Sequence, residues 1–147
     1  MKQLKITSSI FEQNQQIPEK YGCKNQAPNP PITIEGAPPE TKSLALIMDD
    51  PDAPSGPFDH WVVWNIPPST TKIVENSVPG TEGLNSSRRR GYTCPYPPSG
   101  THRYFFKVFA LNVMLDLNAS SGKRDLEKAM NGHILAQGEL VGLFTRR

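Results

Sequence analysis

Proline is the feature that most restricts what this chain can fold into. Fifteen of its 147 residues are proline, and all of them lie between Pro18 and Pro98. A proline has no backbone N–H and a fixed φ, so it interrupts both helix interiors and sheet ladders. The chain therefore favours short strands joined by long, stiff loops and excludes a helical bundle.

Length and charge restrict the kind of protein further. A chain of 147 residues is long enough for one core, and we expect a single domain spanning residues 1–147. The formal net charge of +2 is too small to indicate a nucleic-acid partner. No apolar run approaches the ~20 residues of a membrane span. The N-terminus also lacks the apolar core of a signal peptide. We expect a cytoplasmic protein with no stable membrane insertion.

Apolar patterning predicts a mainly β fold. Ser43–Asp49 is apolar almost throughout and suits a strand buried on both faces. His60–Ile66 and His102–Leu111 are rich in aromatic and β-branched residues, as strands are. A short strand is expected at Ile32–Ile34 and a final one at Ile134–Thr145.

One helix and one long loop complete the pattern. In Lys123–Met130 the apolar residues recur at helical spacing, and Asn131-Gly132 follows as a stop signal. Residues Pro67–Gly100 are polar and rich in proline and glycine, which predicts a long and therefore functional loop. The sequence predicts antiparallel sheets with one short helix near the C-terminus.

Polar side chains cluster where the predicted strands begin or end. Asp50 follows one strand, while His60 and His102 open two others. If the strands are antiparallel neighbours, these residues meet at one end of the sheet, and strand alternation places Tyr104 on the same face as His102. A carboxylate fixes the tautomer of an imidazole and leaves its second nitrogen available. With loop N–H groups nearby, this arrangement suits a phosphate-type anion.

The same segments resemble a known family. The runs D-D-P-D-A-P, H-W-V-V-W-N-I-P and C-P-Y-P-P-S-G-T-H-R-Y-F-F-K-V-F-A-L look like those of the phosphatidylethanolamine-binding proteins, closest to the compact bacterial and archaeal branch that is also labelled Raf kinase inhibitor-like. The resemblance runs from about Tyr21 to Thr145. It implies a Greek-key arrangement of antiparallel sheets with a small cavity for phosphate-bearing molecules. The cavity residues it implies are Asp50, Ala53, Pro54, His60, Pro95, His102 and Tyr104.

One position and one short segment depart from the family pattern. Cys94 stands where the family usually has glycine before the first proline of the second motif, so we add it to the cavity residues. An acidic segment expected after Cys23 reads Lys24-Asn25-Gln26. The two cysteines are too few for a disulfide framework or a zinc knuckle. A Cys23–Cys94 bridge stays open, although a reducing compartment favours free thiols.

These observations favour a non-enzymatic binding or regulatory protein without a cofactor. Its expected partner is a phosphate-type anion or a phosphorylated ligand, with a kinase or a serine protease as the protein partner that the resemblance implies, and a homodimer stays open. One alternative is a serine protease inhibitor that acts through an exposed loop such as Leu84–Tyr92 or Pro67–Gly83. A hydrolase is a weaker alternative, since no nucleophile motif is present. The spacing of Asp50, His60 and His102 matches no metal motif.

Overall fold

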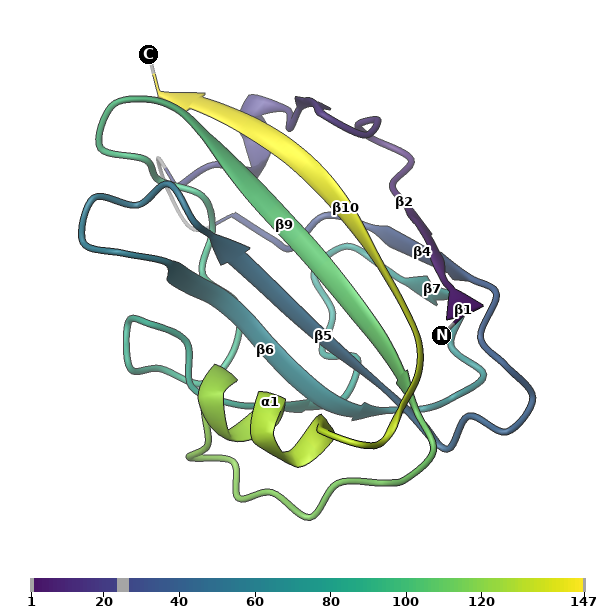
Figure 1. Ribbon diagram of the computed structural model, residues 1–147. Helices are drawn as coiled ribbons and strands as arrows, with labels where there is room; N and C mark the ends of the chain where they lie inside the picture. Colours follow the sequence, from purple (N-terminus) through teal and green to yellow (C-terminus); the bar gives the residue numbers. More distant parts are fainter. Residues whose placement is uncertain (1, 24–26, 147) are drawn as a thin grey trace.

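The computed structural model describes residues 2–23 and 27–146. Lys24, Asn25 and Gln26, which depart from the family pattern, lie outside the described residues. The chain forms a seven-stranded sheet in the order β1-β10-β9-β5-β6-β8, with β3 beside β10, and a three-stranded sheet in the order β2-β4-β7 (Figure 1). The elements are β1 Lys2–Gln3, β2 Lys5–Thr7, β3 Gln15–Gln16, the 3-10 turn η1 Glu19–Tyr21, β4 Ile32–Glu35, β5 Ser43–Asp50, β6 Phe58–Ile66, β7 Lys72–Ile73, β8 Thr81–Glu82, β9 Gly100–Leu111, α1 Lys123–Met130 and β10 Ile134–Arg146.

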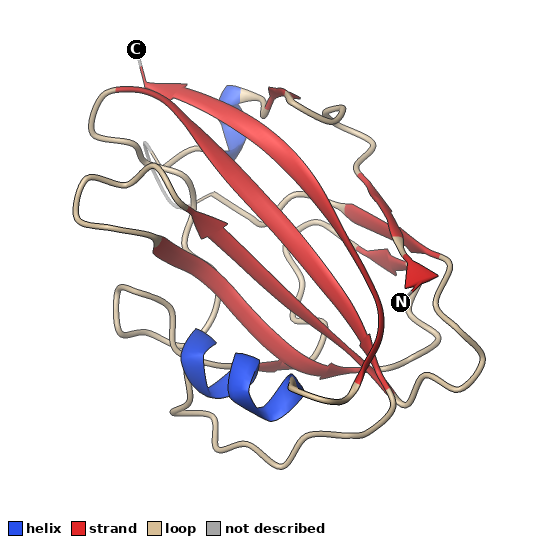
Figure 2. Ribbon diagram, viewed as in Figure 1, coloured by secondary structure: helices blue, strands red, loops and turns tan. Residues whose placement is uncertain are grey.

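The mainly β fold with one helix near the C-terminus is confirmed (Figure 2). The four long strands pair antiparallel, whereas the short β1 and β3 run parallel to β10. Strand β9 lies beside β5 instead of beside its predecessors in sequence, β6 and β8. All fifteen prolines fall outside the strands, as their missing N–H groups require.

The central strand β5 is buried along its whole length. Leu44, Leu46 and Met48 face the core shared with the three-stranded sheet. Ala45 and Ile47 face the opposite core, which α1 covers with Leu126 and Met130. Because both faces are covered, β5 shows no apolar–polar alternation, which explains its unbroken apolar run.

The two tryptophans of β6 illustrate the two cores. Trp61 packs into the core beneath the three-stranded sheet, and Trp64 packs into the core beneath α1. Both side chains are fully buried. The two side chains point to opposite faces of β6, and both are buried because the three-stranded sheet covers one face and the helix covers the other.

The helix has the predicted bounds, and Gly132 follows it with a φ of 83°, a left-handed conformation that glycine tolerates. The prediction that Pro67–Gly100 forms one long loop is in part wrong. It contains the two-residue strands β7 and β8, and Gly100 already belongs to β9. Strands this short carry no readable alternation, so only pairing in the folded chain defines them.

The bridge between the two cysteines, which the sequence left open, is present. Cys23 and Cys94 form a disulfide with 5.4 Å between their Cα atoms, across a sequence separation of 71 residues. The Cys23 amide also donates to the Pro95 carbonyl at 2.9 Å. This contact fixes the segment after η1 against the loop that precedes β9.

Reduction of this disulfide should destabilise the fold. Closing a loop of this length lowers the entropy of the unfolded chain, and the expected loss on reduction is about 4 kcal/mol in the free energy of unfolding. Urea unfolding with and without dithiothreitol measures it. The double variant Cys23→Ser/Cys94→Ser is the control and should show no response to the reductant. An unchanged transition of the wild-type protein would contradict the prediction.

Candidate functional site

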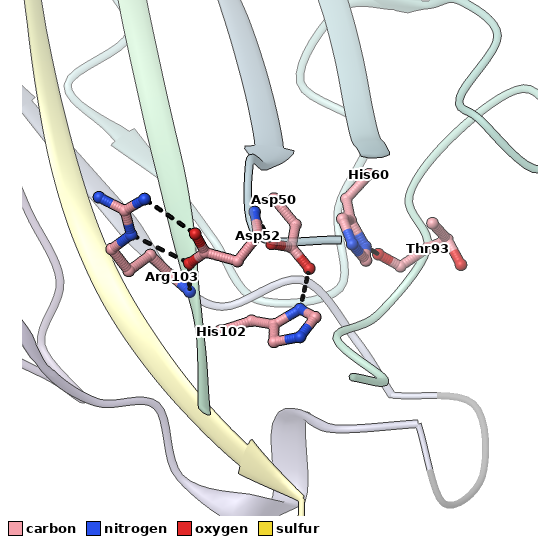
Figure 3. A network of polar contacts seen from close by, with 6 residues as sticks. All are labelled: Asp50, Asp52, His60, Thr93, His102 and Arg103. Carbon is pink, nitrogen blue, oxygen red and sulfur yellow. Dashed lines mark hydrogen bonds and ion pairs between the residues drawn. The ribbon is translucent and has the colours of Figure 1, made fainter. Parts of the chain in front are cut away.

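The antiparallel pairing of three long strands brings Asp50, His60 and His102 to one end of the large sheet (Figure 3). Asp50 is the last residue of β5, and this strand pairs with β6 on one side and with β9 on the other. His60 and His102 are each the third residue of their strands. All three side chains are buried.

His60 reaches this site through a β-bulge. Met48 pairs with Trp61 and Asp49 pairs with Asp59, so His60 is an extra residue with no partner on β5. A bulge can re-aim a side chain that regular alternation would place on the other face. The His60 ring lies edge-on to Tyr104, with 5.3 Å between ring centroids, although its neighbour Trp61 belongs to the same side of the sheet.

Asp50 and His102 form a buried pair. Nδ1 of His102 lies 2.6 Å from Oδ2 of Asp50, and the side-chain exposures are 10% and 4%. The other carboxylate oxygen of Asp50 accepts the Asp52 amide at 2.8 Å. With Nδ1–H donating to the carboxylate, Nε2 is the nitrogen of His102 that remains for another partner.

His60 is fixed in a similar way by a backbone group. Its Nδ1 donates to the Thr93 carbonyl at 2.7 Å, and the Thr93 amide donates to the His60 carbonyl at 2.9 Å. Burial lowers the pKa of His60 below its usual value, and the bond to Thr93 only partly opposes this effect. The free imidazole is therefore mainly neutral at pH 7, again with Nε2 unused by the bond to Thr93.

Tyr104 contributes a buried hydroxyl. This oxygen makes no hydrogen bond of normal geometry with the described residues, although the Asp50 carboxylate lies near enough to interact with it. Burial and the nearby Asp50 carboxylate raise the pKa of Tyr104, so the phenol is neutral and can donate. A buried donor without a partner costs free energy, and a ligand atom that accepts from it would recover that cost.

These side chains line a cavity of about 400 Å³, here called the strand-end pocket. Of the predicted residues, Asp50, Ala53, Pro54, His60, Cys94, His102 and Tyr104 line it. Pro95 is not among the lining residues; it is buried, and its carbonyl accepts a hydrogen bond from the Cys23 amide. The lining residues that the sequence did not single out are Cys23, Phe58, Ser87, Thr93, Tyr96, Pro97 and Pro98.

Some of the lining residues that the sequence analysis missed stand next to the predicted motifs, and others do not. Phe58 stands two residues before His60, and its ring lies 4.8 Å from the imidazole. Thr93 and Tyr96 flank the predicted Cys94-Pro95 pair. Cys23 and Ser87 belong to neither motif, so only the folded chain shows that they line the pocket.

An exposed ion pair braces the loop that follows Asp50. The Arg103 guanidinium donates to both oxygens of Asp52 at 2.8 and 3.0 Å, and the Arg103 amide donates at 2.9 Å. These bonds lower the pKa of Asp52 to about 2. Through these bonds Asp52 connects this loop to β9.

No group of three or more His, Cys, Asp or Glu side chains within residues 2–23 and 27–146 is arranged to hold a metal ion. Asp49, the neighbour of Asp50, points to the helix side. Its carboxylate accepts from Lys107 at 3.2 Å and from Lys123 at 3.0 Å. The Asp49-Asp50 pair therefore serves two faces of the sheet.

Comparison with known proteins agrees with this fold. The family model described as phosphatidylethanolamine-binding protein matches residues 7–145. A UPF0098 protein of Methanothermobacter thermautotrophicus is 44% identical, over 97% of this chain and 99% of its own length. One of Aquifex aeolicus is 45% identical, over 97% and 89%.

Two solved structures share the fold. A homologue of the phosphatidylethanolamine-binding proteins from Chlamydia trachomatis superposes with a TM-score of 0.95 at 36% identity, with both chains fully covered. YbcL of Escherichia coli, described as a member of the mammalian family, gives a TM-score of 0.88 at 25% identity over 99% of both chains. The chain belongs to the phosphatidylethanolamine-binding protein family. None of the described helices is long and apolar enough to cross a membrane.

Two aspartates of this site should differ in their contribution to stability. Asp50→Ala leaves the buried His102 without its acceptor, and the expected loss is about 1–3 kcal/mol in the free energy of unfolding. Asp52→Ala removes an exposed ion pair, and the expected loss is about 1 kcal/mol or less. Urea unfolding of both variants tests this order. Equal losses would contradict the prediction, because they would show that the buried Asp50–His102 pair contributes no more to stability than the exposed Asp52–Arg103 pair.

Proposed function

We propose that this protein is a non-enzymatic binding protein that holds a phosphate-type group in the strand-end pocket. One observation carries the proposal: two buried imidazoles, each engaged at Nδ1, line the same cavity as a buried hydroxyl without a partner. Nε2 of His60, Nε2 of His102 and the Tyr104 hydroxyl are the three groups that would contact the anion. Such groups donate to phosphate oxygens when the imidazoles are protonated.

The charge of the pocket indicates how an anion would bind. Among the described residues that line it, Asp50 is the only carboxylate, and there is no lysine or arginine. A dianion is repelled by this carboxylate unless the imidazoles take up protons. Binding should therefore raise the pKa of His60 and be coupled to proton uptake.

The same residues support the absence of turnover. Cys94 is joined to Cys23 and cannot act as a thiolate nucleophile. The His60 and His102 rings are held by a backbone carbonyl and by Asp50, which fits fixed donors for a bound group. A protein kinase or serine protease as partner, and a homodimer, stay predictions.

The structure offers no specific support for protease inhibition. In Leu84–Tyr92 the side chain of Asn85 accepts the Ser87 amide at 2.8 Å and donates to the Gly91 carbonyl at 2.9 Å. Arg88 has a φ of 61°. This segment is a closed hairpin, whereas a loop that fits a protease cleft is extended. Inhibition of a chymotrypsin-like enzyme stays a prediction.

The cytoplasmic location also stays a proposal. Disulfides persist mainly in oxidising compartments, although intracellular proteins of hyperthermophiles contain them as well. The Cys23–Cys94 bridge therefore weighs against a strongly reducing environment. Cell fractionation with thiol trapping tests both points together.

Phosphate binding should be visible at the two histidines. Titration with phosphate, phosphoethanolamine and phosphoserine should shift the imidazole NMR signals of His60 and His102, while the more exposed His133 is the internal control. Tyr104→Phe should weaken binding roughly fivefold to tenfold, because one hydrogen bond is lost. The fold of this variant should be unaffected, since the hydroxyl makes no hydrogen bond of normal geometry with the described residues. Silent signals of both pocket histidines at millimolar ligand would disprove the proposal.

Anion affinity should rise as the pH falls. His60 has a lowered pKa in the free protein, so the bound state takes up a proton, and the affinity increases until the pH reaches that lowered value. Sulfate is the suitable probe because it remains a dianion across pH 5–8. Calorimetry in buffers of different ionisation enthalpy measures the proton uptake. An affinity independent of pH would contradict the role of the imidazoles.

A further inference from the structure

A second, larger cavity adjoins the strand-end pocket. This polar cleft has a volume of about 810 Å³ and shares the wall residues Ser87, Thr93 and Cys94 with the pocket. The wall between the two cavities therefore includes the residue whose carbonyl holds His60 and one half of the disulfide. A ligand larger than phosphate can occupy both cavities only by passing this shared wall.

One side of the polar cleft is formed by Leu84–Tyr92, here called the arginine hairpin. Arg89 and Arg90 line the cleft, whereas Arg88 does not. The hairpin is fixed from within by the buried Asn85. Its backbone amide donates to the Arg89 carbonyl at 2.9 Å, in addition to the bonds of its side chain. The positions of the arginine backbones are therefore set before any ligand arrives.

The carboxylates of the cleft are already engaged with protein donors. One oxygen of Glu82 accepts from the Trp61 indole at 2.8 Å, and Glu75 accepts from the Tyr21 hydroxyl and pairs with Lys20 at 3.6 Å. By contrast, Arg90 uses only Nε, which donates to the Glu82 carbonyl at 3.1 Å. The outer nitrogens of Arg90 and the Arg89 guanidinium make no hydrogen bond or ion pair within the described part of the chain. A guanidinium with free N–H groups matches a phosphate or a carboxylate.

Tyr92 gives the cleft a counterpart of Tyr104. Its hydroxyl is buried, has no partner among the described residues, and belongs to a side chain that lines the cleft. Its ring packs edge-on against Trp61, with 5.3 Å between centroids, so the phenol is held in place. Each cavity is thus lined by one tyrosine whose buried hydroxyl has no partner among the described residues, and by a pair of side chains with nitrogen donors: His60 and His102 in the pocket, Arg89 and Arg90 in the cleft.

We propose that the polar cleft is a second anion subsite, and that the protein selects phosphorylated small molecules that carry another anionic group. The first phosphate occupies the strand-end pocket, and the second group, a phosphate or a carboxylate, binds Arg89, Arg90 and the Tyr92 hydroxyl. This inference rests on the proposed function of the pocket. It adds a specificity that the pocket alone lacks, because a monophosphate leaves the arginine hairpin unused.

Matched ligands test the subsite. Calorimetry compares the mono- and bisphosphates of butane-1,4-diol and hexane-1,6-diol, so that two spacer lengths are covered. For at least one spacer the bisphosphate should bind roughly tenfold more tightly than its monophosphate, as expected for added charge-assisted hydrogen bonds. This gain is well above the factor of two that two equivalent ends provide.

Variants of the hairpin separate a built subsite from general attraction. Arg89→Gln/Arg90→Gln should remove the bisphosphate advantage and leave monophosphate affinity unchanged. Arg88→Gln removes the same charge from the same hairpin outside the cleft and should keep most of the advantage. Tyr92→Phe should reduce the advantage, whereas Tyr104→Phe should weaken both ligands.

Three other outcomes of these experiments would overturn the inference. Equal affinity for both ligands at both spacers, with His60 and His102 responding, disproves the second subsite and leaves the proposed function intact. An equal loss in Arg88→Gln and in the double variant shows unspecific attraction. Bisphosphate binding with silent pocket histidines, or no binding of either ligand, disproves the bipartite site together with the proposed function.

Discussion

The antiparallel pairing of β5 with both β6 and β9 is the constraint on which the rest of this structure depends. It makes β5 the centre of the large sheet and buries it on both faces. The same pairing sets three strand ends side by side, so that Asp50 and His102 meet at 2.6 Å. Core packing and site geometry therefore both depend on the register of β5. A slip in that register would misplace the pocket residues and expose apolar side chains.

At the end of β5 that carries Asp49 and Asp50, the two faces of the sheet make different contacts. On the helix side, Asp49 binds Lys107 and Lys123 and connects α1 to the central strand. On the other side, Asp50 holds His102 and the turn at Asp52. One pair of adjacent aspartates thus supports both the packing of the helix and the floor of the pocket, because successive strand residues point in opposite directions.

The pocket and the polar cleft also differ in the kind of positive charge they offer. Imidazoles supply it in the pocket and acquire it only with a proton, while guanidinium groups supply it permanently in the cleft. A ligand that uses both would owe its pH dependence to the first cavity and its salt dependence to the second. The disulfide at the shared wall connects these environments to the N-terminal segment.

The sequence by itself determined the β class, the bounds of α1, and the facing of His102 and Tyr104, because these follow from local patterns of alternation and helical spacing. It also placed Asp50 and His102 at strand ends that the folded chain brings together. Only the tertiary structure decided which strands are neighbours, that Cys23 reaches Cys94, and that Ser87 borders both cavities, since these contacts join distant segments. It also decided the orientation of His60, which depends on a bulge in the pairing of β6 with β5 that no local pattern encodes.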